Sequence, residues 1–103
     1  MARTPIHPGE ILAEELTESR LSAAQLARAL DVPPNRISQI IAGKRAISAD
    51  TALRLARYFR TSPDLWMNLQ KNYDLDLARQ RLGKAINHFP QRPEASPRVL
   101  QRL

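Results

Sequence analysis

LSAAQLARALDVPPNRISQIIAG, residues 21–43, is the stretch that decides the fold of this chain. Ser22 followed three residues later by Gln25 forms a capping box, which predicts the start of a helix. The apolar residues after it recur at helical spacing until the letters DVP interrupt them. A second helix is predicted over about residues 34–42, with Gly43 ending it in the left-handed conformation. We therefore expect two short helices joined by a tight turn.

Three further helices are predicted around this pair. One spans about residues 8–19 and begins with a proline, which suits the first helical position. Another begins at Ser48, and the last begins at Ser62, where a serine followed by a proline marks a helix start. The helical apolar pattern stops after Leu82, and no segment alternates apolar and polar residues as a strand does. The sequence predicts an all-α fold of five helices.

The chain divides in two by composition. Residues 1–82 hold the five predicted helices and are assigned to one domain for DNA binding and dimerisation. Residues 83–103 form a basic tail with three prolines, which we expect to be extended or disordered. The 103-residue length fits one small domain of this kind.

Charge favours an anionic partner. Sixteen basic and ten acidic residues give a net charge of +6, and residues 20–60 alone hold eight basic residues against two acidic ones. A basic excess of this kind is typical of nucleic-acid binding. There is no cysteine, which agrees with a reducing cytosol, and no apolar run approaches the roughly 20 residues that span a bilayer. We expect no membrane partner.

No catalytic or metal-binding pattern is present. The two histidines, His7 and His88, are far apart in sequence, and neither has an acidic partner at ligand spacing. The three glycines do not form a loop that could cradle a phosphate. The sequence therefore predicts neither catalytic residues, nor a metal site, nor a cofactor, and we do not expect an enzyme.

The second helix of the opening stretch presents polar residues away from its apolar side. On a wheel of about 100° per residue with Ile37 at the centre of the apolar stripe, Asn35 and Gln39 fall near 160° and 200°. Arg36 and Ser38 flank them. Amides pair with adenine and arginine with guanine in the major groove, so this face is typical of a recognition helix.

Residues around this helix are suited to hold a DNA backbone. Lys44 and Arg45 follow it directly, and cations there normally contact phosphates. Ser22 begins the preceding helix, where its N–H and hydroxyl could contact a phosphate. The competing interpretation is an ordinary helical hairpin with a solvated polar face. The joint pattern of capped helix, turn, outward amides and basic loop favours DNA binding.

The last predicted helix has an apolar stripe with two possible uses. It either closes the core of the monomer or forms the seam of a dimer, and we expect each use for part of it. Two recognition helices have to lie about 34 Å apart to reach successive major grooves, which gives a dimer a functional reason. The stripe consists of Trp66, Leu69, Tyr73 and Leu77.

Four segments together resemble one known family. They are HPGEIL near the start, then LSAAQLARAL, then VPPNRISQIIAGKRAISADTALRLARYF, and SPDLWMNLQKNYDL. In these segments, which cover about residues 5–78, the chain is similar to the HigA-type antitoxins of the Xre and phage-repressor-like helix-turn-helix superfamily. The block of residues 32–59 is the most specific part of the match.

The resemblance implies a lambda-repressor-like fold and a bacterial, cytoplasmic homodimer. Such proteins bind and neutralise a small, basic, RelE-like or HigB-like toxin that cleaves mRNA at the ribosome. They also bind palindromic, double-stranded operator DNA and repress their own operon. Carried over by position, the candidate base readers are Asn35, Arg36, Ser38 and Gln39, and the candidate phosphate contacts are Ser22, Lys44 and Arg45.

An acidic face on the first helix gives the toxin a possible contact. Glu10, Glu14 and Glu18 recur at a spacing of four residues, and a basic toxin would be attracted to them. A solvated helix face is the simpler interpretation of the same pattern.

Two residues depart from the family pattern. Many relatives have a phosphate-binding glutamine directly after the serine that begins the second helix, where this chain has Ala23. Many have glycine in the turn, where this chain has Asp31, a residue that tolerates the left-handed conformation better than most.

Two other functions stay open on the sequence. One is a transcription regulator without a toxin partner, which would share the DNA-reading residues. The other is a protein-interaction adaptor that no longer binds DNA, an alternative that Ala23 keeps open.

Overall fold

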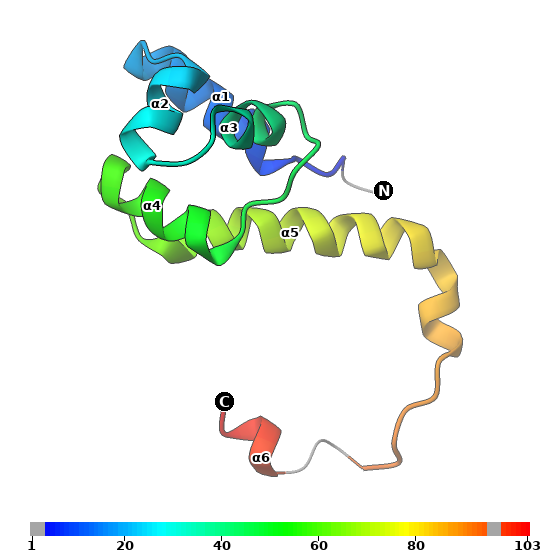
Figure 1. The fold of residues 1–103 in the computed structure, drawn as a ribbon. Coiled ribbons are helices and arrows are strands. Elements are labelled where there is room, and N and C mark those ends of the chain that lie inside the picture. Colours follow the sequence, from blue (N-terminus) through cyan, green and yellow to red (C-terminus); the bar gives the residue numbers. More distant parts are fainter. Residues whose placement is uncertain (1–3, 95–97) are drawn as a thin grey trace.

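The computed structural model describes residues 4–94 and 98–103 of the chain, and all regular structure in that part is helical (Figure 1). The predicted all-α fold with five helices up to residue 82 is confirmed, and the helix limits agree with those expected to within a residue or two. The helices are α1 Pro8–Ser19, α2 Ala23–Leu30, α3 Pro34–Ile41, α4 Ala49–Phe59 and α5 Pro63–Leu82, followed by a 3-10 helix, η1, at Gly83–His88 and a short helix, α6, at Arg98–Gln101.

Side-chain caps fix where most of these helices begin. Ser22, Ser48 and Ser62 each accept a hydrogen bond from a backbone N–H in the first turn of the helix that follows, as their sequence positions predict. His7 caps α1 in the same way: its Nδ1 accepts from the N–H of Gly9, and its own N–H donates to the Glu10 carboxylate. Histidine is not among the usual capping residues, and the sequence analysis did not assign it this role.

The core lies where α1 to α4 meet the first half of α5. Within this group α2 packs on α3, α1 lies against both α3 and α5, and α4 lies along α5. Its apolar side chains are almost completely shielded from solvent, with Trp66 of α5 closing one side at 3 % exposure. The buried hydrophobic residues are Leu12, Leu16, Leu26, Ala27, Leu30, Ile37, Ile40, Ile47, Ala52, Leu55, Ala56 and Trp66.

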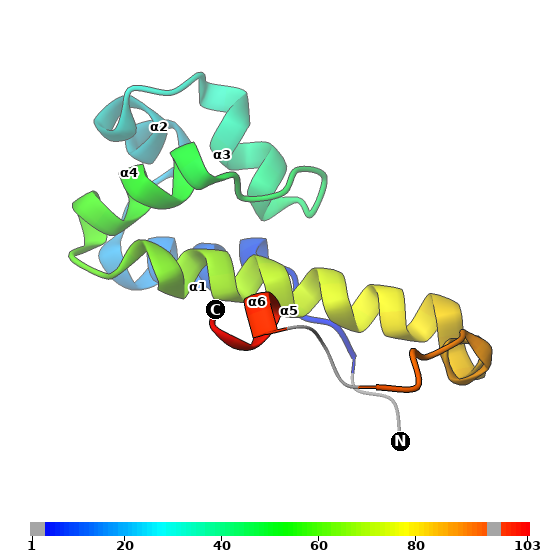
Figure 2. The same ribbon diagram turned by 90° about the horizontal axis from the view of Figure 1, so that it is seen from below.

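The second half of α5 extends beyond the other helices in both views (Figure 1, Figure 2). Beyond it, the described part of the tail holds the two short helical segments η1 and α6, which the sequence does not predict. All described residues after Leu82 are exposed to solvent, so the tail adds nothing to the core. No helix in the described part of the chain has both the length and the apolar character needed to cross a membrane.

Candidate nucleic-acid interface

The helix α3 divides into a buried and an exposed side. Ile37 and Ile40 have no exposed surface, whereas Asn35 and Ser38 are exposed on the side away from the core, as the wheel predicts. The Ser38 hydroxyl donates to the backbone carbonyl of Asn35 at 3.3 Å. The Asn35 side chain makes no hydrogen bond within the described residues, so both its donor and its acceptor groups are available to a ligand.

Gln39 is half-buried and is bound to a neighbour. The Nε of Arg45, in the loop after α3, donates to the Gln39 Oε1 at 2.8 Å. From the sequence, Gln39 is predicted to read a base and Arg45 to contact a phosphate, with no link between the two. The structure brings them together on one surface.

Arg36 lies at the edge of this surface and is tied to α4. Its Nη1 donates to the Asp50 carboxylate at 3.1 Å, and the Nε of Arg54 donates to the same oxygen at 3.0 Å. Asp50 therefore holds two guanidinium groups. To contact a base, the Arg36 guanidinium has to release Asp50 or use its remaining N–H donors while it stays bound to Asp50.

Arg54 also stabilises the turn between α2 and α3. Its Nη1 donates to the backbone carbonyls of Leu30 at 2.6 Å and of Asp31 at 3.3 Å, which lie at the C-terminal end of α2. Asp31 has the left-handed conformation, with φ 57° and ψ 50°, which aspartate tolerates better than most residues. This role of Arg54 is not predicted from the sequence, although a spacing of four residues from Asp50 is a recognised signal for a side-chain pair on a helix.

The N-terminal ends of α2 and α3 differ in what they offer a phosphate. At α2, the Ser22 N–H donates to Gln25 Oε1 and its hydroxyl oxygen accepts from the Gln25 N–H, so only the hydroxyl proton is left to donate. At α3, no side chain of the described residues caps the helix, which begins with Pro33 and Pro34. Proline has no N–H and the Arg36 N–H donates to the Pro33 carbonyl at 3.0 Å, so in the first turn of α3 the Asn35 N–H is the group left for an anion.

A buried amide anchors the basic loop after α3. Gln70 of α5 is only 6 % exposed; its Oε1 accepts from the Ile47 N–H at 2.7 Å, and its Nε2 donates to Asp74. Gly43 begins the loop with φ 75°, in the predicted left-handed conformation. The loop leaves Lys44 exposed, and this lysine has no partner within the described residues. Nothing in the sequence pattern singled out Gln70.

The C-terminal end of α3 rests on the start of α1. A Cβ added at Gly9 would overlap the backbone carbonyl of Ile40, so only glycine fits the contact between the two helices. The ring of His7, next to it, packs edge-on against Tyr73 of α5 with a centroid distance of 4.8 Å. The HPGE segment thus positions α3 against α1 and α5.

The α5 stripe serves mainly the interior of the monomer. Trp66 is buried and its Nε1 donates to the Thr61 hydroxyl at 2.9 Å, while Leu69 packs on the core. Tyr73 and Leu77 are half-buried. Whether part of the stripe also forms a dimer seam stays a prediction.

The acidic side chains of α1 differ in their surroundings. Glu10 is engaged in the cap of the helix, where its carboxylate accepts from the His7 N–H. Glu14 and Glu18 are exposed. Contact of this face with a toxin stays a prediction.

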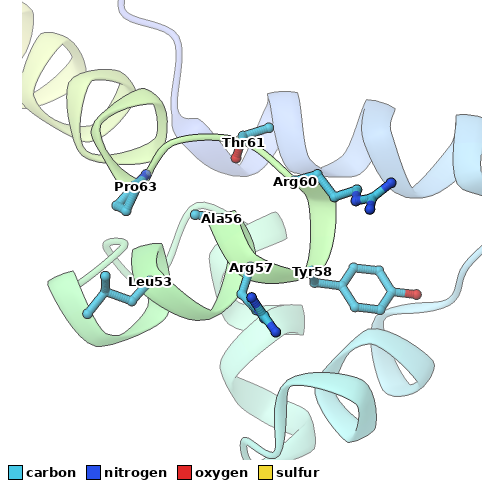
Figure 3. A pocket seen from close by; sticks show the side chains of 7 residues that line it. All are labelled: Leu53, Ala56, Arg57, Tyr58, Arg60, Thr61 and Pro63. Carbon is cyan, nitrogen blue, oxygen red and sulfur yellow. The ribbon is translucent and has the colours of Figure 1, made fainter.

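A hollow of about 700 Å³ opens at the end of α4, and none of the candidate DNA-contacting residues lines it (Figure 3). Its lining combines apolar side chains with two arginines and the Tyr58 phenol, and contains no carboxylate, histidine or cysteine. Within the described residues, no group of His, Cys, Asp and Glu could hold a metal ion. The lining residues are Leu53, Ala56, Arg57, Tyr58, Arg60, Thr61 and Pro63.

Residues 12–66, which include α2, α3 and α4, match the helix-turn-helix family. An addiction module antidote protein of the HigA family from Coxiella burnetii has the same fold, with a TM-score of 0.80 and 50 % identity, over 92 % of this chain and 99 % of that one. The chain belongs to the HigA family of helix-turn-helix antitoxins. The resemblance inferred from the four sequence segments is confirmed.

Two further proteins are similar to this chain, and one of them is also a HigA antitoxin. The Pseudomonas aeruginosa antitoxin HigA, solved with the higBA promoter, is 49 % identical with a TM-score of 0.82, over 88 % of this chain and 100 % of that one. Virulence-associated protein I of Dichelobacter nodosus is 55 % identical over 76 residues, which are 73 % of this chain and 70 % of that protein. The HigA relationship thus holds for the whole helical body rather than for the helix-turn-helix alone.

Proposed function

We propose that this HigA-family chain represses its own operon by binding a palindromic operator as a homodimer. The observation that carries the proposal is the HigA relative solved with promoter DNA, because its fold covers 88 % of this chain. The exposed side of α3 supports the same function. It combines an unpartnered Asn35, the uncapped start of α3 and the free cation of Lys44, which together suit bases and phosphates.

We also propose that the chain is an antitoxin that neutralises a small, basic, RelE-like toxin in the bacterial cytoplasm. Membership of the HigA family and the exposed carboxylates of Glu14 and Glu18 support this. The chain would act by binding and not by catalysis.

A homodimer is proposed because a palindrome presents two equal half-sites. The monomer leaves several large apolar side chains exposed on α4 and α5, among them Leu53 at 60 %, Leu65 at 45 % and Leu75 at 43 %. Such residues are available for a second copy. Sedimentation equilibrium should give twice the 11.7 kDa mass of the chain, and a monomer at micromolar concentration would contradict this part.

Two parallel assays separate the DNA-binding function from the toxin-neutralising function. The chain is co-expressed with the small protein of the adjacent gene, and the purified chain is mixed with duplex DNA from upstream of its own gene at two salt concentrations. We expect relief of toxicity, a stable complex, and operator binding that weakens steeply with salt. DNA binding with a harmless neighbour would instead indicate a regulator without a toxin, and toxin binding without DNA binding would indicate a protein-interaction role.

A further inference from the structure

The hydrogen bond between Arg45 and Gln39 joins two side chains that both face the proposed DNA site. Gln39 is in the second turn of α3, and Arg45 is six residues later in the loop, so folding alone brings them to 2.8 Å. Arg45 is exposed and has no carboxylate partner within the described residues. The bond is thus formed by groups of the chain itself.

The chemistry of arginine fixes which way the amide faces. A guanidinium has five N–H donors and no acceptor, so the atom that Gln39 turns to Arg45 has to be its carbonyl oxygen. The amide nitrogen of Gln39, with two N–H donors, is the atom left for another partner. Arg45 also keeps its Nη donors, since only its Nε is used.

This arrangement changes the base that Gln39 suits. A free glutamine pairs with adenine by accepting from N6 and donating to N7, which needs its oxygen and its nitrogen together. Here the Gln39 oxygen already accepts one hydrogen bond, and the positive charge beside it disfavours the approach of the partly positive N6 amino hydrogens of adenine. Guanine offers only acceptors, O6 and N7, on its major-groove edge.

We propose that Arg45 is a positioning residue that orients the Gln39 amide, so that the pair selects guanine over adenine at one base pair of each half-site. This rests on the proposed operator binding. Arg45 would act through Gln39, in addition to any contact that it makes with a phosphate.

The test uses selection from a library of duplex DNA with a randomised 24-base-pair segment, followed by sequencing of the bound fraction. The wild-type chain should prefer guanine at one position, which Gln39→Ala identifies by losing the preference there. Arg45→Met keeps the length of the side chain and removes its donors. In the sequences bound by Arg45→Met, the ratio of adenine to guanine at that position should rise by about tenfold. A change of this size is typical of one bidentate contact.

Lys44→Met is the matched control, because it removes a charge from the neighbouring residue and leaves the Arg45–Gln39 bond in place. It should weaken binding to all sequences and keep the guanine preference. A guanine preference retained by Arg45→Met, or an adenine preference in the wild type, would overturn the inference while leaving operator binding intact. A wild-type chain with no base preference at any position would contradict both the inference and the proposed function.

A second measurement needs no DNA. Exchange of the Arg45 Nε proton with solvent, followed by nuclear magnetic resonance in the free protein, should be several-fold slower in the wild type than in Gln39→Ala. Equal exchange rates would show that the bond is not held in solution and would overturn the inference.

Discussion

Gln70 and Ile47 are joined by a hydrogen bond of 2.7 Å that spans 23 residues of sequence, from the backbone N–H of Ile47 to the side-chain oxygen of Gln70. This bond connects the loop after α3 to the long helix α5. Since Gln70 is buried and its nitrogen is bound to Asp74, both ends of the amide are satisfied. The basic loop therefore takes its position from α5 as well as from α3.

Gln70→Ala should lower the free energy of unfolding by about 1–3 kcal/mol, because the buried N–H of Ile47 loses its acceptor. Urea titration followed by circular dichroism measures this. Asn68→Ala on the exposed side of the same helix is the control and should change stability by less than about 0.5 kcal/mol. Equal effects of the two substitutions would contradict the anchoring role of Gln70.

Gly9→Ala should destabilise the protein by about 1–3 kcal/mol, because the added Cβ meets the Ile40 carbonyl. Replacing glycine by alanine within a helix normally raises the stability by about 0.5–1 kcal/mol, so a decrease in stability here would identify the clash. Gly83→Ala is the comparison: it meets no atom within 4 Å and only strains a backbone with φ 54°. In thermal unfolding, Gly9→Ala should lower the melting temperature more than Gly83→Ala does. Gly9→Ala should also weaken DNA binding, whereas Gly83→Ala should leave DNA binding unchanged.

Arg54→Ala and Arg36→Ala should differ although both remove an ion pair with Asp50. Arg54 also donates to the part-buried carbonyl of Leu30, so its loss should cost about 1–3 kcal/mol. Arg36 has no such second bond, and an exposed ion pair contributes only about 0–1 kcal/mol. Urea unfolding of both variants measures the difference. Equal losses would indicate that the pair with Asp50, and not the turn, carries the effect.

Gln39→Ala should reduce operator affinity by about 1–3 kcal/mol and relax specificity at one base pair. Lys44→Ala should weaken binding to all sequences alike and lower the salt dependence by about one phosphate contact. Fluorescence anisotropy with operator and scrambled duplexes at several salt concentrations distinguishes the two. Sequence-independent losses of equal size from both variants would contradict these role assignments.

The helix limits were predictable because their signals are local. Ser22, Ser48 and Ser62 stand at helix starts, and the N–H that each caps lies three residues further along the chain. The left-handed turn at Asp31 and the one at Gly43 also depend on a single residue. Such signals can be read without knowledge of the packing.

The rest of the site depends on residues that meet only after folding. Gln70 is one polar residue among others on α5, and no spacing rule links it to Ile47, 23 residues earlier. Arg45 and Gln39 could be placed on the same surface, but not within hydrogen-bonding distance of each other. His7 was overlooked because histidine seldom caps a helix, although Glu10 is at the right spacing for a capping box.

The bare backbone contact between Gly9 and Ile40 has a mechanical consequence. Side chains between two helices normally absorb small displacements, since they can change rotamer when one helix shifts. At Gly9 no side chain separates the two helices, so the backbone of α1 lies directly against the backbone at the end of α3. The position of the C-terminal end of α3 is therefore set by the backbone of α1 itself, and not by the rotamer of any side chain between them.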